Sequence, residues 1–87
     1  MTKEKINYFL GDAIRPLRQA KGLTQEQLAE NSKLNRTYMV DLETKNVNPS
    51  FYTIYKIAIG LGIPVEELVK RIADNTDIDR IFKEEPY

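Results

Sequence analysis

The side chains best suited to chemistry gather on one side of a predicted helix over residues 35–44. The helical spacing of the apolar residues indicates which side of this helix faces outward. The residues on that side are Asn35, Arg36, Thr37, Val40, Asp41 and Thr44. Arginine pairs with guanine, asparagine with adenine and aspartate with the cytosine amino group, while threonine and valine contact the thymine methyl group. This face is therefore suited to the base edges of a DNA major groove.

Other chemistries are poorly supported by the composition. The 87 residues contain no Cys and no His, which excludes disulfides, Cys/His zinc sites and imidazole-based catalysis. The adjacent acids Glu66–Glu67 and Glu84–Glu85 would point in different directions on a helix, unlike two acids that converge on a substrate. The four glycines are scattered singly, so there is no phosphate-binding glycine loop. We expect no enzyme activity, no cofactor and no metal.

The charge is balanced overall but polarised along the chain. Thirteen basic residues face thirteen acidic ones, whereas DNA-binding proteins are usually basic. Residues 15–48 carry a net charge of +2, and residues 65–87 carry a net charge of −3. No stretch reaches the roughly 18 apolar residues of a membrane span, and residues 1–6 lack a secretory signal. We therefore expect a cytoplasmic protein without membrane contact.

The elements that must position the outward face are helices only. Apolar spacing of three and four predicts helices over about 5–21, 25–31, 35–44 and 51–61, and a fifth from 64 through 72. We predict an all-α, compact five-helix domain over residues 1–75. Residues 76–87 form a C-terminal extension, in which Ile78, Ile81 and Phe82 have helical spacing.

Local signals mark where these helices begin and end. Thr24 and Gln27 have the spacing of a capping box, and Asn35 and Ser50 are predicted N-caps. Gly22 suits the left-handed residue that ends the first helix. Gly62 follows the fourth helix, and Pro64 opens the fifth because proline is tolerated in a first turn. Pro16 interrupts the first helix, so we expect a kink or a fresh start near Asp12.

The order of motifs over residues 11–69 resembles the Cro/repressor (XRE) helix-turn-helix family. The matching pieces are Ile14-Arg15, Leu17-Arg18, residues 22–29, residues 35–39, Leu42-Glu43, Asn48-Pro49-Ser50, Ile57-Ala58, Leu61-Gly62 and Glu67-Leu68. The resemblance implies a five-helix, repressor-like regulator of transcription that binds a palindromic double-stranded DNA operator as a dimer. It also implies a buried ion pair between Arg18 and Glu43. The run 34–39 is similar to controller proteins of restriction–modification systems, although phage repressors, plasmid repressors and antitoxins share the scaffold.

Two positions depart from the family pattern. Lys33 and Lys45 stand where the family usually has glycine, in the turn before residue 35 and after the recognition helix. A non-glycine residue with positive φ costs about 1 kcal/mol, so we expect strain or a rebuilt turn at Lys33.

The predicted DNA-binding residues are Thr24, Gln25, Asn35, Arg36, Thr37, Tyr38, Asp41, Lys45, Asn46, Asn48 and Ser50. Arg36 and Thr37 are the expected base readers, and Gln25 is expected at a phosphate with the amides of its helix turn. Four polar residues lie where a loop could touch the DNA backbone: Lys45, Asn46, Asn48 and Ser50. Asn35 serves either as a cap alone or also as a DNA contact. Tyr38 belongs to the core or to the groove, and Asp41 meets cytosine or orients Arg36.

A surplus of apolar residues predicts a second interface. Tyr52, Tyr55, Ile59, Val65, Val69 and Ile72 exceed what a small core can absorb. They form either a loosely covered surface or, as we prefer, a homodimer interface, because symmetric half-sites need a paired protein. The competing function is a protein-interaction module or antitoxin, which the neutral charge favours and the Gln25, Arg36 and Thr37 set opposes.

Overall fold

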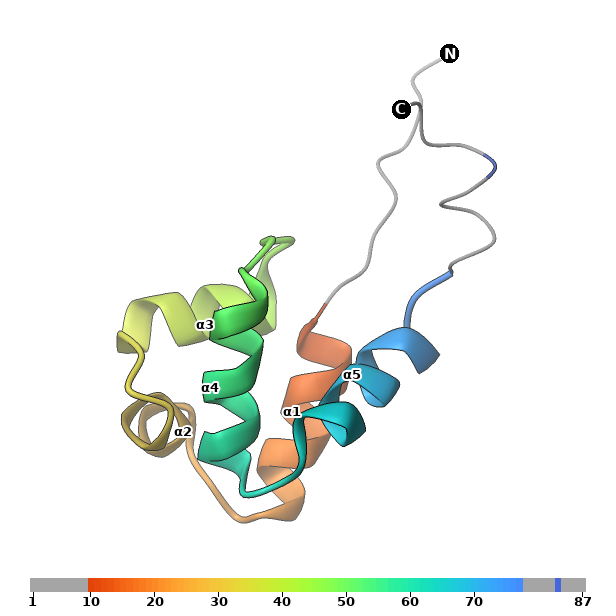
Figure 1. Cartoon of the computed structure of the whole chain (residues 1–87). Coiled ribbons are helices and arrows are strands. Elements are labelled where there is room, and N and C mark those ends of the chain that lie inside the picture. Colours follow the sequence, from red (N-terminus) through yellow and green to blue (C-terminus); the bar gives the residue numbers. More distant parts are fainter. Residues whose placement is uncertain (1–9, 78–82, 84–87) are drawn as a thin grey trace.

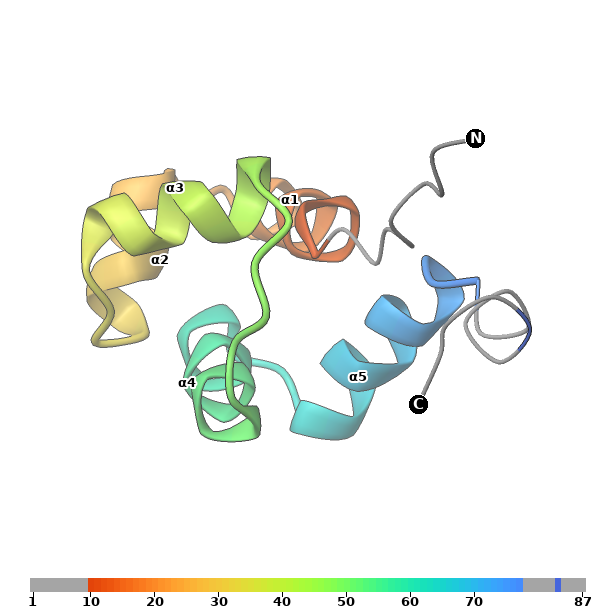
Figure 2. The ribbon, with the colours of Figure 1, turned by 90° about the horizontal axis from the view of Figure 1, so that it is seen from above.

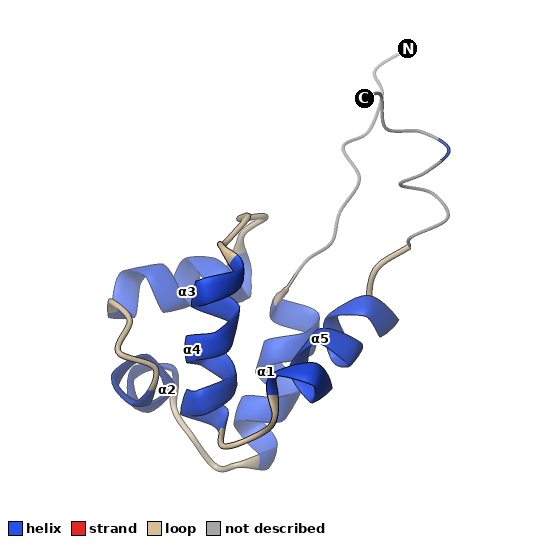
Figure 3. Cartoon of the chain, viewed as in Figure 1, coloured by secondary structure: helices blue, strands red, loops and turns tan. Residues whose placement is uncertain are grey.

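The computed structural model describes residues 10–77 and Lys83, and these residues form five α-helices and no strand (Figures 1 and 3). The helices are α1 (Gly11–Ala20), α2 (Gln25–Asn31), α3 (Arg36–Thr44), α4 (Phe51–Leu61) and α5 (Val65–Asp74). The predicted all-α, five-helix architecture is confirmed. The expected helical residues 5–9 and the extension residues Ile78, Ile81 and Phe82 lie outside the described part of the chain.

The helices form two groups around one core. Figure 2 shows α1, α2 and α3 along one side and α4 and α5 along the other. The largest fully buried apolar side chains are Ile14, Leu28, Met39, Leu42, Ile57 and Leu68. They come from all five helices, and burying each stabilises the fold by about 1.5–3 kcal/mol. No helix among the described residues is long and apolar enough to cross a bilayer.

α1 keeps Pro16 in its interior. The helix is described from Gly11, beside Asp12, with Leu10 as its N-cap, so the choice between a kink and a fresh start stays a prediction. Because Pro16 has no N–H, the Asp12 carbonyl loses the backbone bond that a helix would give it. Leu10, Ile14 and Leu17 are buried on its inner face.

Three helices end in the same way. One residue adopts the left-handed conformation, and the N–H of the next residue donates to the carbonyl five residues earlier. The left-handed residues are Gly22 (φ 69°), Lys33 (φ 54°) and Gly62 (φ 73°). After Lys33, the Leu34 N–H donates to the Ala29 carbonyl over 2.9 Å, which is the bond of a Schellman motif. Glycine adopts this conformation at little cost, whereas lysine does not. The strain predicted at Lys33 is therefore present, and the turn keeps the geometry that glycine would give it.

The N-caps are those that the sequence predicted. Thr24 Oγ1 accepts from the Gln27 N–H over 3.0 Å, and Gln27 Oε1 accepts from the Thr24 N–H over 2.9 Å. Asn35 Oδ1 accepts from two N–H groups in the first turn of α3. Ser50 Oγ accepts from the Thr53 N–H over 3.2 Å. These bonds set where α2, α3 and α4 begin.

α2 and α4 meet closely at Gly60 and Ser32. A Cβ atom added to Gly60 would lie 3.0 Å from both the backbone N and the Cβ of Ser32, and closer still to its Oγ. Ser32 is 2% exposed, and its Oγ has no hydrogen-bond partner among the described residues. The pair therefore holds α4 against α2 at a distance that only glycine permits.

Candidate nucleic-acid interface

α3 follows α2 after a turn of four residues, 32–35, and has two different sides. Met39, Leu42 and Glu43 are buried against the other helices. Arg36, Thr37 and Thr44 are exposed, and Val40 and Asp41 are half-buried. The outward face predicted from the spacing is thus present on α3.

Arg36, at the start of α3, forms only a weak, exposed ion pair. Its Nη1 lies 4.0 Å from Glu26 Oε2, and both side chains are about 70% exposed. Exposed ion pairs contribute about 0–1 kcal/mol. Arg36 can therefore leave Glu26 for a stronger partner, and Thr37 beside it is also exposed.

Asp41 pairs with the residue that follows α3. Its Oδ1 lies 3.4 Å from Lys45 Nζ, one helical turn away. The expected role of orienting Arg36 is not seen, because Arg36 is paired with Glu26 instead. A carboxylate paired with Lys45 repels a nearby phosphate less than a free one would.

Four other predicted DNA-contacting residues also stabilise the fold. Thr24, Asn35 and Ser50 accept the capping bonds of α2, α3 and α4. Tyr38 is half-buried and packs against the core, so it belongs at least in part to the interior. All four still lie at or near helix starts, which is where backbone N–H groups bind phosphate.

The loop after α3 is anchored by its middle residue. Lys45, Asn46 and Asn48 are exposed, whereas Val47 is half-buried and packs against the core. The Val47 N–H donates to the Lys45 carbonyl over 3.1 Å. This tight turn presents the three polar side chains around a fixed point.

Glu43 joins three helices at the inner side of α3. It is fully buried, and Arg18 Nε donates to its Oε2 over 2.7 Å, so the expected ion pair is present. Arg18 also donates to the Leu23 carbonyl over 2.7 Å. Gln25 Nε2, expected at a phosphate, donates to Glu43 Oε1 over 3.2 Å. One carboxylate therefore ties α3 to α1 and to the first turn of α2.

Arg15 is a contact that the sequence reasoning missed. Its Nη2 donates to the backbone carbonyl of Glu43 over 2.7 Å, and its Nε lies 3.7 Å from Glu43 Oε1. The bond satisfies one of the four carbonyls that lack a partner at the end of α3. The available signal was the i, i+3 spacing from Arg18, which places both guanidinium groups on one face of α1.

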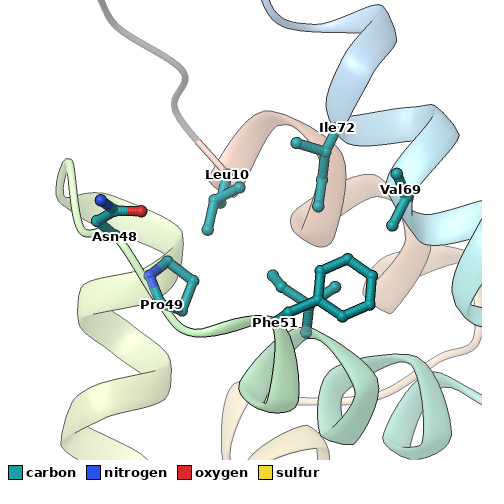
Figure 4. A pocket seen from close by; sticks show the side chains of 7 residues that line it. Leu10, Asn48, Pro49, Phe51, Val69 and Ile72 are labelled. Carbon is teal, nitrogen blue, oxygen red and sulfur yellow. The ribbon is translucent and has the colours of Figure 1, made fainter. Parts of the chain in front are cut away.

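The six predicted interface residues do not form one surface. Val65 and Ile72 are half-buried and pack on the chain's own core. One hollow, the apolar groove between α1, α4 and α5, is lined by Leu10, Asn48, Pro49, Phe51, Ile54, Val69 and Ile72 (Figure 4). Another, the lysine-rimmed hollow between α2 and α4, is lined by Asn31, Ser32, Lys33, Tyr52, Tyr55, Lys56 and Ile59. Phe51, which is 58% exposed, is a further apolar surface residue that the sequence reasoning did not assign.

A capped α2, a tight turn and an α3 with an exposed polar face define a helix-turn-helix unit. Residues 14–68 match the family model described as helix-turn-helix, and the chain belongs to this family of XRE-type regulators. Within the described residues, no three acidic side chains come close enough together to hold a metal ion.

Relatives of this chain include a phage repressor and controller proteins. The immunity repressor of Bacillus phage phi105 is 42% identical over 60 residues, which are 69% of this chain and 42% of the repressor. This chain thus spans about two-fifths of that repressor's length. The restriction-modification controller protein C.AhdI from Aeromonas hydrophila is 43% identical with a TM-score of 0.65, over 70% of this chain and 92% of C.AhdI. C.Esp1396I bound to a 19 base pair DNA duplex is 28% identical with a TM-score of 0.70, over 78% and 91% of the two chains.

Proposed function

We propose that this chain is a non-enzymatic, cytoplasmic transcription regulator that binds a double-stranded DNA operator by placing α3 in the major groove. The observation that carries the proposal is the contrast between the two sides of α3. Its inner side is fixed to α1 and α2 through buried Glu43, and its outer side leaves Arg36 and Thr37 exposed. A rigid helix with free polar side chains at its N-terminal end is what base recognition requires.

Gln25 supports this docking in a way that the sequence alone did not suggest. An amide nitrogen carries two hydrogens, and the bond to Glu43 uses one of them. The second hydrogen is available to a phosphate at the start of α2. Glu43 would therefore hold the Gln25 amide in place before DNA arrives, which lowers the entropy lost on binding.

We further propose that the protein binds a palindromic operator as a homodimer joined through the apolar groove. In a two-fold interface, each surface meets a copy of itself. The groove is lined by uncharged residues, including exposed Phe51 and Val69, so two copies can meet without bringing like charges together. The two α3 helices would then enter successive major grooves, about 34 Å apart.

Within the family, control of a restriction–modification system is the role we favour. Support comes from the extent of the match, which covers 92% of C.AhdI but only 42% of the phage repressor. An operator upstream of the protein's own gene is the expected target. The alternative is a protein-interaction module or antitoxin, which would use the same fold without specific operator binding.

Fluorescence anisotropy with a duplex from upstream of the protein's own gene tests this function. We expect specific binding whose affinity falls by a factor of roughly 10³–10⁵ between 50 and 200 mM salt, if six to ten phosphates are contacted. A shuffled duplex of the same composition is the control. Equal affinity for both duplexes, or no binding at low salt, would reject the regulator in favour of the protein-interaction module.

A further inference from the structure

The lysine-rimmed hollow is an exposed apolar surface that the proposed function does not use. Its volume is about 280 Å³. On α4, Tyr52 is 70% exposed and Ile59 is 72% exposed, and Tyr55 lies between them. The base-reading residues Arg36 and Thr37 and the apolar groove are not among its lining. Large apolar side chains exposed side by side at a hollow mark an interaction surface.

The position of Lys33 suggests that the rim of this hollow has a role. The two other helices that end on a left-handed residue do so with Gly22 and Gly62. Lys33 adopts the same conformation with φ 54° and has an exposed side chain. A strained residue that persists where glycine would fit points to a use for its side chain. Here the side chain stands at the edge of the hollow.

The second lysine of the rim is also held in place. Lys56 Nζ lies 5.1 Å from the centroid of the Tyr52 ring and 3.5 Å from the Lys33 carbonyl oxygen. Ser32, which lines the hollow, is in close contact with Gly60, and this contact holds α4 against α2. The shape of the hollow and the position of one ammonium group are therefore set before any partner binds, as in preorganised interfaces.

We propose that the lysine-rimmed hollow docks an acidic segment of another protein that presents an apolar side chain flanked by carboxylates. Two ammonium groups and no carboxylate line the hollow, whereas the whole chain has no net charge. The attraction for an acidic partner is thus local to this surface. Ile59 and the tyrosine rings lose their exposed apolar surface only when an apolar group packs on them. A phosphate backbone does not offer such a group. A second copy is disfavoured because two-fold pairing would bring lysine toward lysine.

NMR titration of the ¹⁵N-labelled full chain tests this proposal. The probe is a synthetic 14-residue amphipathic peptide with leucine at every third or fourth position and glutamate elsewhere. We expect saturable shifts of the Lys33, Tyr52 and Ile59 amide signals, and no such shifts with the matched peptide that carries lysine in place of glutamate. Absence of shifts with the acidic peptide, or equal shifts with both peptides, would overturn the proposal.

Variants at the rim provide the matched comparison. Lys33→Glu and Ile59→Ser should each weaken peptide binding at least tenfold, whereas Lys70→Glu, the same charge change on exposed α5, should leave it within twofold. Lys33→Gly should raise Tm by about 4–8 °C by removing the strain, and should weaken peptide binding at least threefold. An unchanged affinity in Lys33→Gly or Lys33→Glu would overturn the role of the rim.

Two further measurements separate the other possible occupants. If a dT₁₂ oligonucleotide shifts the same signals more strongly than the acidic peptide, the surface binds nucleic acid and the proposal is wrong. If these signals move with protein concentration alone, a second copy covers the hollow and the proposal is also wrong. Operator binding, measured separately on each variant, should be unchanged in Ile59→Ser, so failure of the docking surface is distinguishable from failure of the regulator.

Discussion

Gln25 and Glu43 are joined by a hydrogen bond of 3.2 Å between Nε2 and Oε1, which links the first turn of α2 to the last turn of α3. The two residues are 18 positions apart in the sequence. The same carboxylate also accepts a hydrogen bond from Arg18, so one buried acid sets the angle between the two helices of the helix-turn-helix unit. The orientation of α3 is therefore a property of the interior as much as of the turn.

Glu43→Ala should destabilise the fold strongly. Arg18 is only 12% exposed, and removing its partner would leave a buried charge unpaired, at a cost of about 3–5 kcal/mol. The control is Glu26→Ala, which removes an exposed pair and should cost about 0–1 kcal/mol. Urea unfolding followed by circular dichroism measures both. Similar losses in the two variants would mean that Glu43 does not organise the core.

Gln25→Ala should weaken binding to all DNA sequences about equally. The substitution removes the amide that we place at a phosphate, and phosphate contacts carry no direct sequence information. The slope of log K against log salt should decrease, while base preferences stay the same. Anisotropy on the operator and on single-base variants measures this. A changed base preference would show instead that Gln25 mainly orients α3.

Arg36→Ala should reduce operator affinity by about 1–3 kcal/mol and relax specificity at one base position. The exposed pair with Glu26 contributes little, so Tm should change by no more than a few degrees. Lys70→Ala, which removes an exposed charge on α5, is the control for the loss of one positive charge. Unchanged specific affinity in Arg36→Ala would contradict the proposed docking of α3.

Val69→Asp should convert the proposed dimer to a monomer and weaken operator binding. Val69 is 37% exposed and lines the apolar groove, so a carboxylate there would face its own copy. Ile59→Asp places the same charge in the lysine-rimmed hollow and should remain dimeric. Sedimentation velocity at micromolar concentration distinguishes the two. Dissociation by Ile59→Asp alone would move the homodimer interface to the hollow between α2 and α4.

Gly60→Ala should destabilise the fold by about 1–3 kcal/mol, because the added Cβ meets Ser32 in a packed interior. The double variant with Ser32→Ala should recover part of this loss, since it removes the Oγ atom that the new Cβ meets. Ser32→Ala alone should not destabilise, because it removes a buried hydroxyl without a partner in the described residues. Additive losses in urea unfolding would argue against contact between the two positions.

Where the helices lie could be predicted because the signals are local. Thr24, Asn35 and Ser50 each cap a helix by bonding to N–H groups two or three residues ahead. Gly22 and Gly62 take the left-handed conformation that their position after a helix predicted. The outer face of α3 was predictable for a similar reason, since helical spacing separates it from Met39 and Leu42.

The partners of the polar side chains could not be predicted, because they come from distant parts of the chain. Arg15 reaches Glu43 over 28 positions, and its spacing from Arg18 indicates the shared face of α1 but not the distant partner. The bond from the Gln25 amide to Glu43 was not predictable for the same reason, and the phosphate role of Gln25 stays a prediction. Asp41 was predicted to orient Arg36 or to contact cytosine. It forms an ion pair with Lys45 instead of Arg36, which depends on side-chain packing at the end of α3.

The sequence by itself determined the five helices, the caps at Thr24, Asn35 and Ser50, and the polar outer face of α3, because each depends on neighbours a few residues away. Only the tertiary structure decided how Glu43 holds α3 and how the surplus of apolar residues divides. Val65 and Ile72 pack on the core, Val69 lines the apolar groove together with Ile72, and Tyr52 and Ile59 line the lysine-rimmed hollow. That division depends on the angles at which α2, α4 and α5 pack, which side chains far apart in the sequence set together.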